Sequence, residues 1–353
     1  MAAEEQDRLR AVNDALRADP AAMAAQSTAW LPLESNPSIL NAYSRRVGLG
    51  AEWTWVDVWG LDDEILQAQG LLAVNDPAGD SNSMRVSGNN NPPVVAALLL
   101  LFPCSRRIYE YRAREERTLR ENAEGKCGVR TSFPKMNDDA FFLEQVANFG
   151  NACGTIAATH ALSNCFQPFE SSKKRVECDH RQGGGDEDGR VCGEESFPTF
   201  GREDDEGGTD AEPIGLASNA PLARFISKNA GRSPRDIGRA LFEADDLKES
   251  SDAAASSEEA QTDVPSRDAD PLDHHFVAFV RRRRMKVNNT PGHDDVLLEL
   301  DGTKAGPIEH CLTSPESFVR DVAEVVRRNW IRVDPSNVEF SLMALCWDGA
   351  TTK

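Results

Sequence analysis

The 353-residue sequence lacks a hydrophobic run long enough to cross a membrane. Its longest continuously apolar stretch, Val94–Phe102, is less than half of the ~20 residues that a spanning helix needs. An N-terminal apolar segment flanked by basic residues is also missing, because residues 1–26 mix charges of both signs. We therefore expect a soluble protein with no membrane partner and no secretory signal.

Regular cysteine spacing is missing as well. None of the 8 cysteines forms the C-x-x-C pair that is typical of zinc sites. Cys178, His180 and Cys192 lie near one another in the sequence, but their spacing matches no standard zinc motif, so we predict no metal site and no cofactor. We expect free thiols in a reducing compartment, namely the cytoplasm, with the nucleus as a second location.

Positive charge is scarce, since 39 Lys and Arg stand against 58 Asp and Glu, for a net charge of −19. Phosphate binding needs a positive surface, so nucleic acid is excluded as the main partner and a basic partner is the natural complement. Part of the negative charge lies in segments that we expect to be disordered. The run Arg281–Arg284 is interpreted as the solvated end of a hairpin, with a nuclear-localisation or phosphate-binding patch as the alternative.

Composition divides the chain into one domain and several polar segments. Residues 1–29 are rich in Ala, Glu and Arg and are predicted to form a helical or disordered extension. The pattern then becomes globular, and we predict a single domain over 30–348. Polar insertions are expected at 75–91 and 165–218, and a flexible segment rich in Ser, Ala, Asp and Glu at 245–270.

The apolar pattern predicts an α/β (α+β) domain in which helices surround a sheet. Val94–Phe102 is apolar throughout, as expected for a strand covered on both faces. Further strands are expected at 53–59, 275–280, 296–301 and 340–346, and helices at 37–47, 61–72, 109–123, 153–164, 221–228 and 233–244.

Cys153 stands at the start of one of these predicted helices. An apolar, strand-like run over 140–143 ends at Gln145, and a short loop leads from there to Cys153. The unpaired N–H groups and the dipole at a helix N-terminus favour an anion, so the thiolate of Cys153 would be stabilised and its pKa lowered. Cys153 is therefore a candidate nucleophile, and a buried, inert cysteine is the alternative.

His275 and Asp301 stand at the two ends of a predicted hairpin. A simple fold about residue 288 sets His275 opposite Asp301, and a bulge in the loop would shift this register by one or two residues. A carboxylate beside an imidazole is the geometry of an oriented base. His275 would take the proton from Cys153 and return one to the leaving amine, with Asp301 holding its tautomer.

The other histidines near these positions are weaker candidates. His274 points to the opposite face of its strand. His160 would lie two turns along the Cys153 helix, and we predict a structural role for it. On residue types alone, a surface or packed histidine remains the alternative for His275.

Seven blocks of the sequence resemble the ubiquitin carboxyl-terminal hydrolases, a papain-like cysteine peptidase family that cleaves after the C-terminal glycine of ubiquitin. Several blocks in family order are far more specific than any one motif. The blocks are WLPLESNP (Trp30–Pro37), VDVWGLD (Val56–Asp62), AALLLLFP (Ala96–Pro103), NACGTI (Asn151–Ile156), HALSN (His160–Asn164), HFVAFV (His275–Val280) and ELDGTKAGPIEH (Glu299–His310).

The resemblance implies a monomeric deubiquitinating thiol hydrolase with a knotted, papain-like fold around an antiparallel-rich sheet. It implies Cys153 as nucleophile, His275 as general base and acid, and Asp301 as the orienting carboxylate. By position, 245–270 matches the family's crossover loop, which limits the leaving group to small adducts or flexible peptides. The sequence is similar to short members that lack a C-terminal extension.

The family's oxyanion-hole glutamine corresponds to Gln145, which lies two residues further from Cys153 than the family pattern places it. Ala147 stands six residues before Cys153, where the family pattern places the glutamine, and its side chain cannot donate a hydrogen bond. Either Gln145 still reaches across a bulged loop, or Asn148 replaces it, or the oxyanion hole is impaired. An impaired hole would leave a ubiquitin-binding protein with weak or no catalysis.

Two carboxylates in the matching blocks are candidate substrate contacts. The resemblance implies that Glu34 and Asp57 hold the basic tail that precedes the terminal glycines of ubiquitin. Ordinary solvated carboxylates are the alternative. The expected partner is ubiquitin, with another modifier such as NEDD8 as the alternative.

Overall fold

The structure of the protein is a computed structural model, and it describes residues 30–73, 94–123, 135–136, 140–146, 149–166, 215–262, 273–285 and 293–347. The predicted extension over 1–29 and the predicted insertion over 75–91 lie outside the described residues. So does nearly all of the predicted insertion over 165–218.

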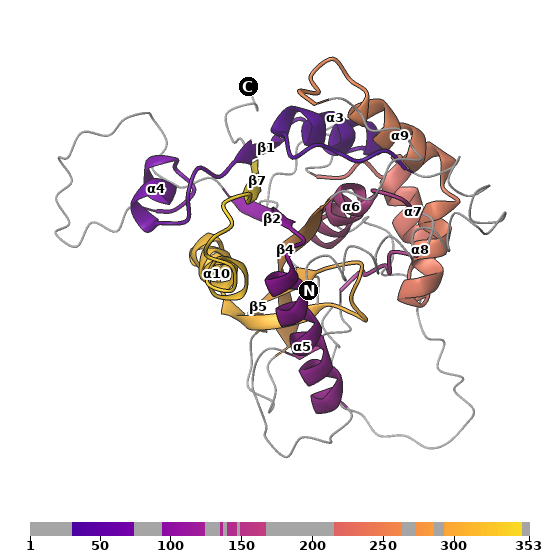
Figure 1. The fold of residues 1–353 in the computed structure, drawn as a ribbon. Helices are drawn as coiled ribbons and strands as arrows, with labels where there is room; N and C mark the ends of the chain where they lie inside the picture. The colour runs from indigo at the N-terminus through magenta and orange to yellow at the C-terminus, as the bar shows by residue number, and fades with distance from the viewer. Residues whose placement is uncertain are drawn as a thin grey trace, which may run out of the picture.

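A seven-stranded sheet in which every pairing is antiparallel forms the centre of the domain (Figure 1). The prediction of an antiparallel-rich α/β domain is confirmed, although two of the strands, β6 and β3, were not predicted. The order across the sheet is β1 (Trp53–Asp57), β7 (Ser341–Trp347), β2 (Val95–Pro103), β4 (His274–Met285), β5 (His293–Leu300), β6 (Ile308–Thr313) and β3 (Lys135–Met136).

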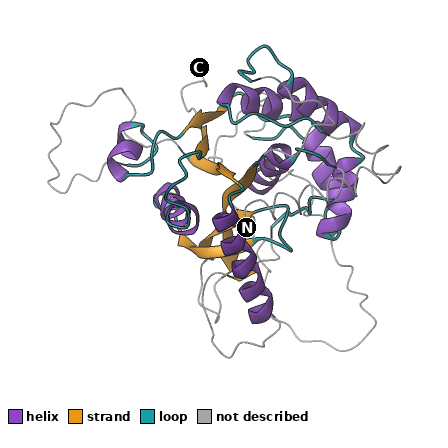
Figure 2. Ribbon diagram, in the orientation of Figure 1, coloured by secondary structure: helices purple, strands orange, loops and turns teal. Residues whose placement is uncertain are grey.

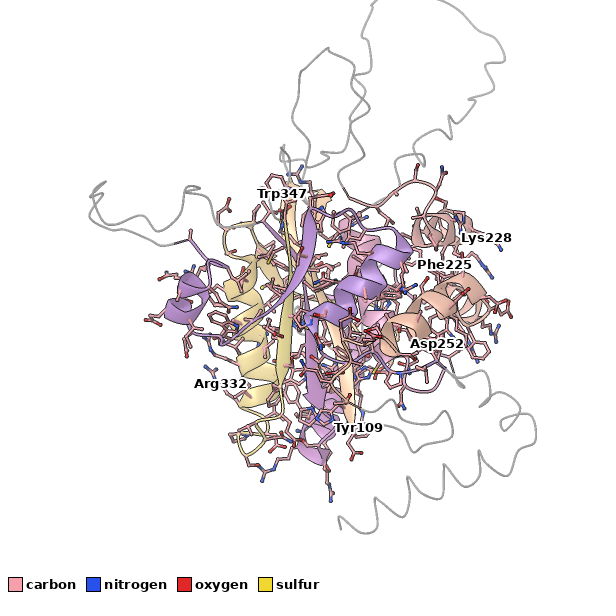
Figure 3. The ribbon with its side chains drawn as sticks, turned by 90° about the horizontal axis from the view of Figure 1, so that it is seen from above. Tyr109, Phe225, Lys228, Asp252, Arg332 and Trp347 are labelled. Atoms are coloured by element: carbon pink, nitrogen blue, oxygen red, sulfur yellow. The ribbon has the colours of Figure 1, made fainter. Side chains whose placement is uncertain are left out.

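Helices cover both sides of the sheet (Figure 2), and each side has its own apolar core. One side carries α3 (Pro37–Val47), α6 (Cys153–Cys165), α7 (Pro221–Asn229), α8 (Pro234–Phe242) and α9 (Asp245–Ala255). The other carries α4 (Asp63–Ala68), α10 (Phe318–Val326) and the π-helical turn η1 (Arg327–Ile331), and α5 (Arg106–Ala123) contacts η1 and β3. Figure 3 shows Phe225 and Asp252 on one side of the strands and Arg332 on the other. None of the described helices has the length and apolarity of a membrane span.

Local sequence signals set the bounds of α3. The side chain of Asn36 accepts a hydrogen bond from the Ser38 N–H at 2.9 Å, and Pro37 fills the first helical position. Gly48 ends the helix with φ = 111°, a left-handed conformation that favours glycine. A Cβ atom at Gly48 would also lie 2.0 Å from the Cβ of Ala220. The two signals together explain why the predicted bounds of this helix are correct.

Helix α6 lies between the sheet and the outer helices, and all of its residues from Gly154 to Asn164 are buried. Small residues allow the close approach. A Cβ atom at Gly154 would lie 3.2 Å from the Phe276 ring of β4 and 3.2 Å from the Cβ of Leu33. The N-terminus of α6 is thereby placed against the start of β4.

Helix α9 corrects one prediction. We expected 245–270 to be flexible, but its first part forms α9, whose residues Leu247 and Ala254 are fully buried. The Leu31 N–H donates to Asp252 Oδ1 at 3.0 Å and ties the helix to the start of the domain. The composition suggested a flexible segment because the buried residues of α9 are few among many polar ones: Leu247, Ser251, Ala254 and Ala255. The segment 263–270 lies outside the described residues.

Candidate active site

Cys153 is the first residue of α6, and its side chain is partly exposed. The preceding residue, Ala152, has no side chain that could cap the helix, so the first N–H groups of α6 favour an anion. The close approach at Gly154 brings the thiol to the point where β4 begins. This is the environment that stabilises a thiolate.

His275 and Asp301 are in direct contact, with Nε2 of His275 2.8 Å from Oδ1 of Asp301. They come from the start of β4 and from the residue that follows β5. The strand register differs from that of a simple fold about residue 288, which would set His275 opposite Asp301. In the structure Ala278 pairs with Leu300, and the same register continued to His275 would set it opposite Thr303. The shift of two residues is absorbed because the chain turns after Leu300, and the Thr303 N–H and hydroxyl donate to Asp301 Oδ1 at 2.9 and 2.8 Å.

A side-chain hydrogen bond also links His275 to Cys153. Because Nε2 contacts Asp301, Nδ1 is the ring nitrogen left for the thiol. Burial alone would raise the pKa of the Cys153 thiol, but the hydrogen bond and charge of His275 and the backbone groups of Phe276 and Gly154 lower it below its usual value. The structure thus brings Cys153, His275 and Asp301 together in one chain of hydrogen bonds.

The charge of Asp301 decides the protonation of His275. Burial opposes the imidazolium, but the charge of Asp301, its hydrogen bond and the contact with Cys153 raise the pKa of His275 to about 10. Burial would likewise raise the pKa of Asp301, but the charges of His275 and Arg112 hold it well below its usual value. At neutral pH the site therefore holds His275 as an imidazolium, beside a Cys153 thiol whose pKa is lowered.

Arg112 is a member of the site that the sequence did not identify. Its Nη2 donates to Asp301 Oδ2 and, at 2.7 Å, to Glu299 Oε1. The guanidinium lies over the rings of Phe102 and Trp330, 5.3 and 4.9 Å from their centroids. All three charged side chains are buried, so Arg112 is the cation that offsets two carboxylates in the core.

A second histidine extends this set of hydrogen-bonded side chains. His310 Nε2 lies 2.8 Å from Glu299 Oε2, and both side chains are fully buried. Burial would raise the pKa of Glu299, but the charge of Arg112 and the hydrogen bond from His310 lower it. The resulting hydrogen-bond network consists of His275, Asp301, Arg112, Glu299 and His310.

Gln145 lies beside the residue that follows Asp301. Its N–H donates to the Gly302 carbonyl at 2.7 Å, and a Cβ atom at Gly302 would lie 3.3 Å from the Gln145 Cβ and 3.0 Å from Cγ2 of Ile156 in the first turn of α6. The segment that carries Gln145 therefore meets both the nucleophile helix and the turn that contains Asp301. Ala147 and the alternative donor Asn148 lie outside the described residues.

The two expected substrate carboxylates differ in their surroundings. Glu34 Oε2 accepts hydrogen bonds from the N–H groups of Gln261 at 2.9 Å and Thr262 at 3.3 Å, so this carboxylate holds the segment that follows α9. Asp57 is the last residue of β1 and is exposed. Of the two carboxylates, only Asp57 is therefore exposed enough to contact a substrate directly at the surface.

The part of the chain that the structure describes contains no cluster of three or more side chains that could hold a metal ion. The zinc candidates Cys178, His180 and Cys192 lie outside it. The described cysteines are all free thiols, as expected: Cys104, Cys153, Cys165, Cys311 and Cys346.

We expect Arg112→Met to lower the free energy of unfolding by about 3–5 kcal/mol, because it removes the guanidinium that contacts both buried carboxylates, Glu299 and Asp301. Adding Glu299→Gln to this variant should restore part of the loss. Urea unfolding followed by circular dichroism measures both effects. Arg114→Met, at an exposed position of the same helix, is the matched control; equal stability of the Arg112 and Arg114 variants would contradict the role of Arg112.

Known proteins of one family are similar to the chain along most of its length. The sequence matches the family described as ubiquitin carboxyl-terminal hydrolase, family 1, over residues 30–75, 80–180 and 210–330. A ubiquitin carboxyl-terminal hydrolase of Drosophila melanogaster is 29% identical over 316 residues, which cover 90% of this chain and 96% of the relative. The isozyme L1 of Homo sapiens is 26% identical over 315 residues, which cover 89% of this chain and 97% of the relative.

Among solved structures, the Trichinella spiralis UCH37 catalytic domain bound to ubiquitin vinyl methyl ester is 16% identical, with a TM-score of 0.48; the alignment covers 92% of this chain and 99% of that chain. The family match spans more than half of this chain and includes Cys153, His275 and Asp301. The chain therefore belongs to the ubiquitin carboxyl-terminal hydrolase family 1 and is a cysteine-type deubiquitinase.

Proposed function

We propose that this deubiquitinase cleaves the bond after the C-terminal glycine of ubiquitin, with Cys153 as nucleophile, His275 as general base and acid, and Asp301 as the orienting carboxylate. The observation that carries the proposal is the chain of hydrogen bonds from Cys153 through His275 to the buried Asp301. The relatives are named ubiquitin carboxyl-terminal hydrolases, which supports ubiquitin as the substrate.

The reaction begins with attack of the Cys153 thiolate on the carbonyl carbon of the terminal glycine. The C–S bond forms, and the carbonyl electrons move onto oxygen. When the tetrahedral intermediate collapses, the C–N bond breaks and the His275 imidazolium gives its proton to the leaving amine. A water molecule then attacks the thioester and His275 takes one of its protons. The C–S bond breaks, which regenerates the Cys153 thiolate, and the glycine carboxyl group gives its remaining proton to solvent as the product leaves.

The oxyanion of both tetrahedral intermediates needs hydrogen-bond donors. The Cys153 N–H at the start of α6 is one, and we assign the side-chain amide of Gln145 as the second. Support for Gln145 comes from the hydrogen bond of its N–H to the Gly302 carbonyl, which holds it beside Asp301 and α6. A catalytic assignment explains the assembled triad better than a role in binding alone, because ubiquitin binding would not require a thiol of lowered pKa beside an imidazolium.

The net charge of −19 suits a substrate whose C-terminal tail is basic. Asp57 is exposed at the end of β1, and we assign it a contact with this tail. Glu34 would act differently. Its carboxylate holds the backbone of Gln261 and Thr262, so we assign it to the position of the segment that follows α9.

Hydrolysis of ubiquitin 7-amido-4-methylcoumarin tests the proposed function. We expect turnover by the wild-type chain and covalent labelling of Cys153 by ubiquitin vinyl methyl ester, located by mass spectrometry. Cys153→Ala should abolish both and should retain ubiquitin binding. Tight binding without turnover by the wild type would contradict the enzyme assignment, and a higher kcat/KM for the NEDD8 substrate would identify that modifier instead.

The pH profile of kcat/KM should reflect the protonation of His275. A cation with a pKa of about 10 is present below that pH and is lost as the pH rises through it, so activity should persist well above pH 8. Asp301→Asn removes the charge that raises this pKa, so the basic limb should move down by about one pH unit or more. The profile is measured with the same fluorogenic substrate, and an unmoved basic limb would show that Asp301 does not set the His275 pKa.

A further inference from the structure

The segment 141–145, which carries Gln145, has no regular secondary structure although Phe142 and Leu143 are buried. A buried backbone outside helices and sheets needs individual partners for its N–H and C=O groups. These partners determine where Gln145 lies. They are Asn164, whose side chain exchanges two hydrogen bonds with Phe141; His160, which accepts from the Leu143 N–H; the Pro234 carbonyl, which accepts from the Glu144 N–H; and the Gly302 carbonyl, which accepts from the Gln145 N–H.

The surroundings of His160 suit it to accept the hydrogen bond from the Leu143 N–H. Its Nε2 lies 3.1 Å from the Leu143 nitrogen, and its ring stacks on Phe142 with a centroid distance of 4.9 Å and an interplanar angle of 8°. Burial lowers the pKa of His160 to about 4, so the ring is neutral at physiological pH. A neutral ring with its proton on Nδ1 can accept at Nε2, whereas an imidazolium could not.

Helix α6 connects this acceptor to the nucleophile. His160 and Asn164 are four residues apart, so they face the same side of α6. The Asn164 Nδ2 also donates to the His160 carbonyl at 2.8 Å, which fixes its side chain. Cys153, His160 and Asn164 thus belong to one buried helix. Helix α6 therefore sets the distance from the thiol to the segment 141–145.

We propose that His160 and Asn164 are positioning residues of the oxyanion hole: they fix the segment 141–145 against α6 and thereby place the Gln145 amide where the oxyanion forms. This inference rests on the proposed function. The two additional residues relative to the family pattern lie after Gln145 in the chain. The hydrogen bonds that hold the segment are made by residues 141–145 themselves and by partners on other elements, so none of them involves the longer loop. Gln145 is therefore held in place independently of the longer loop.

Comparing the rates of two reactions of Cys153 distinguishes a role of His160 in the oxyanion hole from a role in the triad. Amide hydrolysis passes through an oxyanion, whereas alkylation by iodoacetamide is a substitution at a saturated carbon and depends only on the thiolate. His160→Met removes the acceptor and nearly keeps the volume. We expect it to lower kcat on ubiquitin 7-amido-4-methylcoumarin by about 100-fold, with KM and the alkylation rate of Cys153 changed by less than about twofold.

Three further variants complete the experiment. His160→Gln retains an acceptor and should keep kcat within about tenfold of wild type. Thr159→Val, the control, alters the adjacent buried residue of α6, whose hydroxyl contacts Tyr43 OH at 3.1 Å, and should leave kcat unchanged. Asn164→Ala removes the neighbouring anchor and should lower kcat with alkylation unchanged, so it carries the test if His160→Met does not fold.

A double-mutant cycle with Gln145→Ala decides whether the anchors act through Gln145. In that background, His160→Met or Asn164→Ala should have no further effect on kcat. An undiminished kcat in folded His160→Met and Asn164→Ala, or an equal loss of hydrolysis and alkylation, would overturn the proposal. Failure of the proposed function is distinguishable, since the wild-type chain itself would then show no turnover of the ubiquitin substrate.

Discussion

The buried carboxylate of Asp301 is the group on which the active site depends. It contacts His275 on one side and Arg112 on the other, and it accepts two further hydrogen bonds from Thr303. An isolated charge in this position would be strongly unfavourable, but cations on both sides offset the loss of solvent. Asp301 therefore remains ionised, and the ionised form is what stabilises the His275 imidazolium.

Arg112 makes this arrangement part of the core as well as part of the site. Its guanidinium packs against Phe102 and Trp330, and the Phe102 ring in turn contacts the His275 ring edge-on at a centroid distance of 5.6 Å. The aromatic residues keep water away from the ion pairs, which strengthens them. Catalytic geometry and core packing are consequently held by the same side chains.

The sequence predicts the parts of this structure that depend on local signals. Asn36, Pro37 and Gly48 mark the ends of α3, the apolar run of β2 indicates a strand buried on both faces, and the hairpin places His275 near Asp301. The register is two residues from the predicted one because the turn geometry after Leu300 cannot be read from residue types.

Features that depend on tertiary contacts were missed. Arg112 is one of many arginines in α5, and only the packing of that helix against η1 and β3 shows that it is buried. Composition made α9 resemble a flexible segment, since its buried face is formed by few residues. His160 was predicted to be structural, and only the contacts of the segment 141–145 show what it holds in place.

Catalysis depends on a His275 imidazolium that Asp301 stabilises in the resting site, beside a Cys153 thiol of lowered pKa. The chain contains 6 histidines, so nitrogen-15 NMR of the imidazole rings can follow His275, assigned by comparison with His275→Ala. At pH 8 we expect both nitrogens of His275 to be protonated, with titration only near a pKa of about 10. A His275 ring that is neutral at pH 8 and titrates near the ordinary histidine pKa of about 6.5 would contradict it.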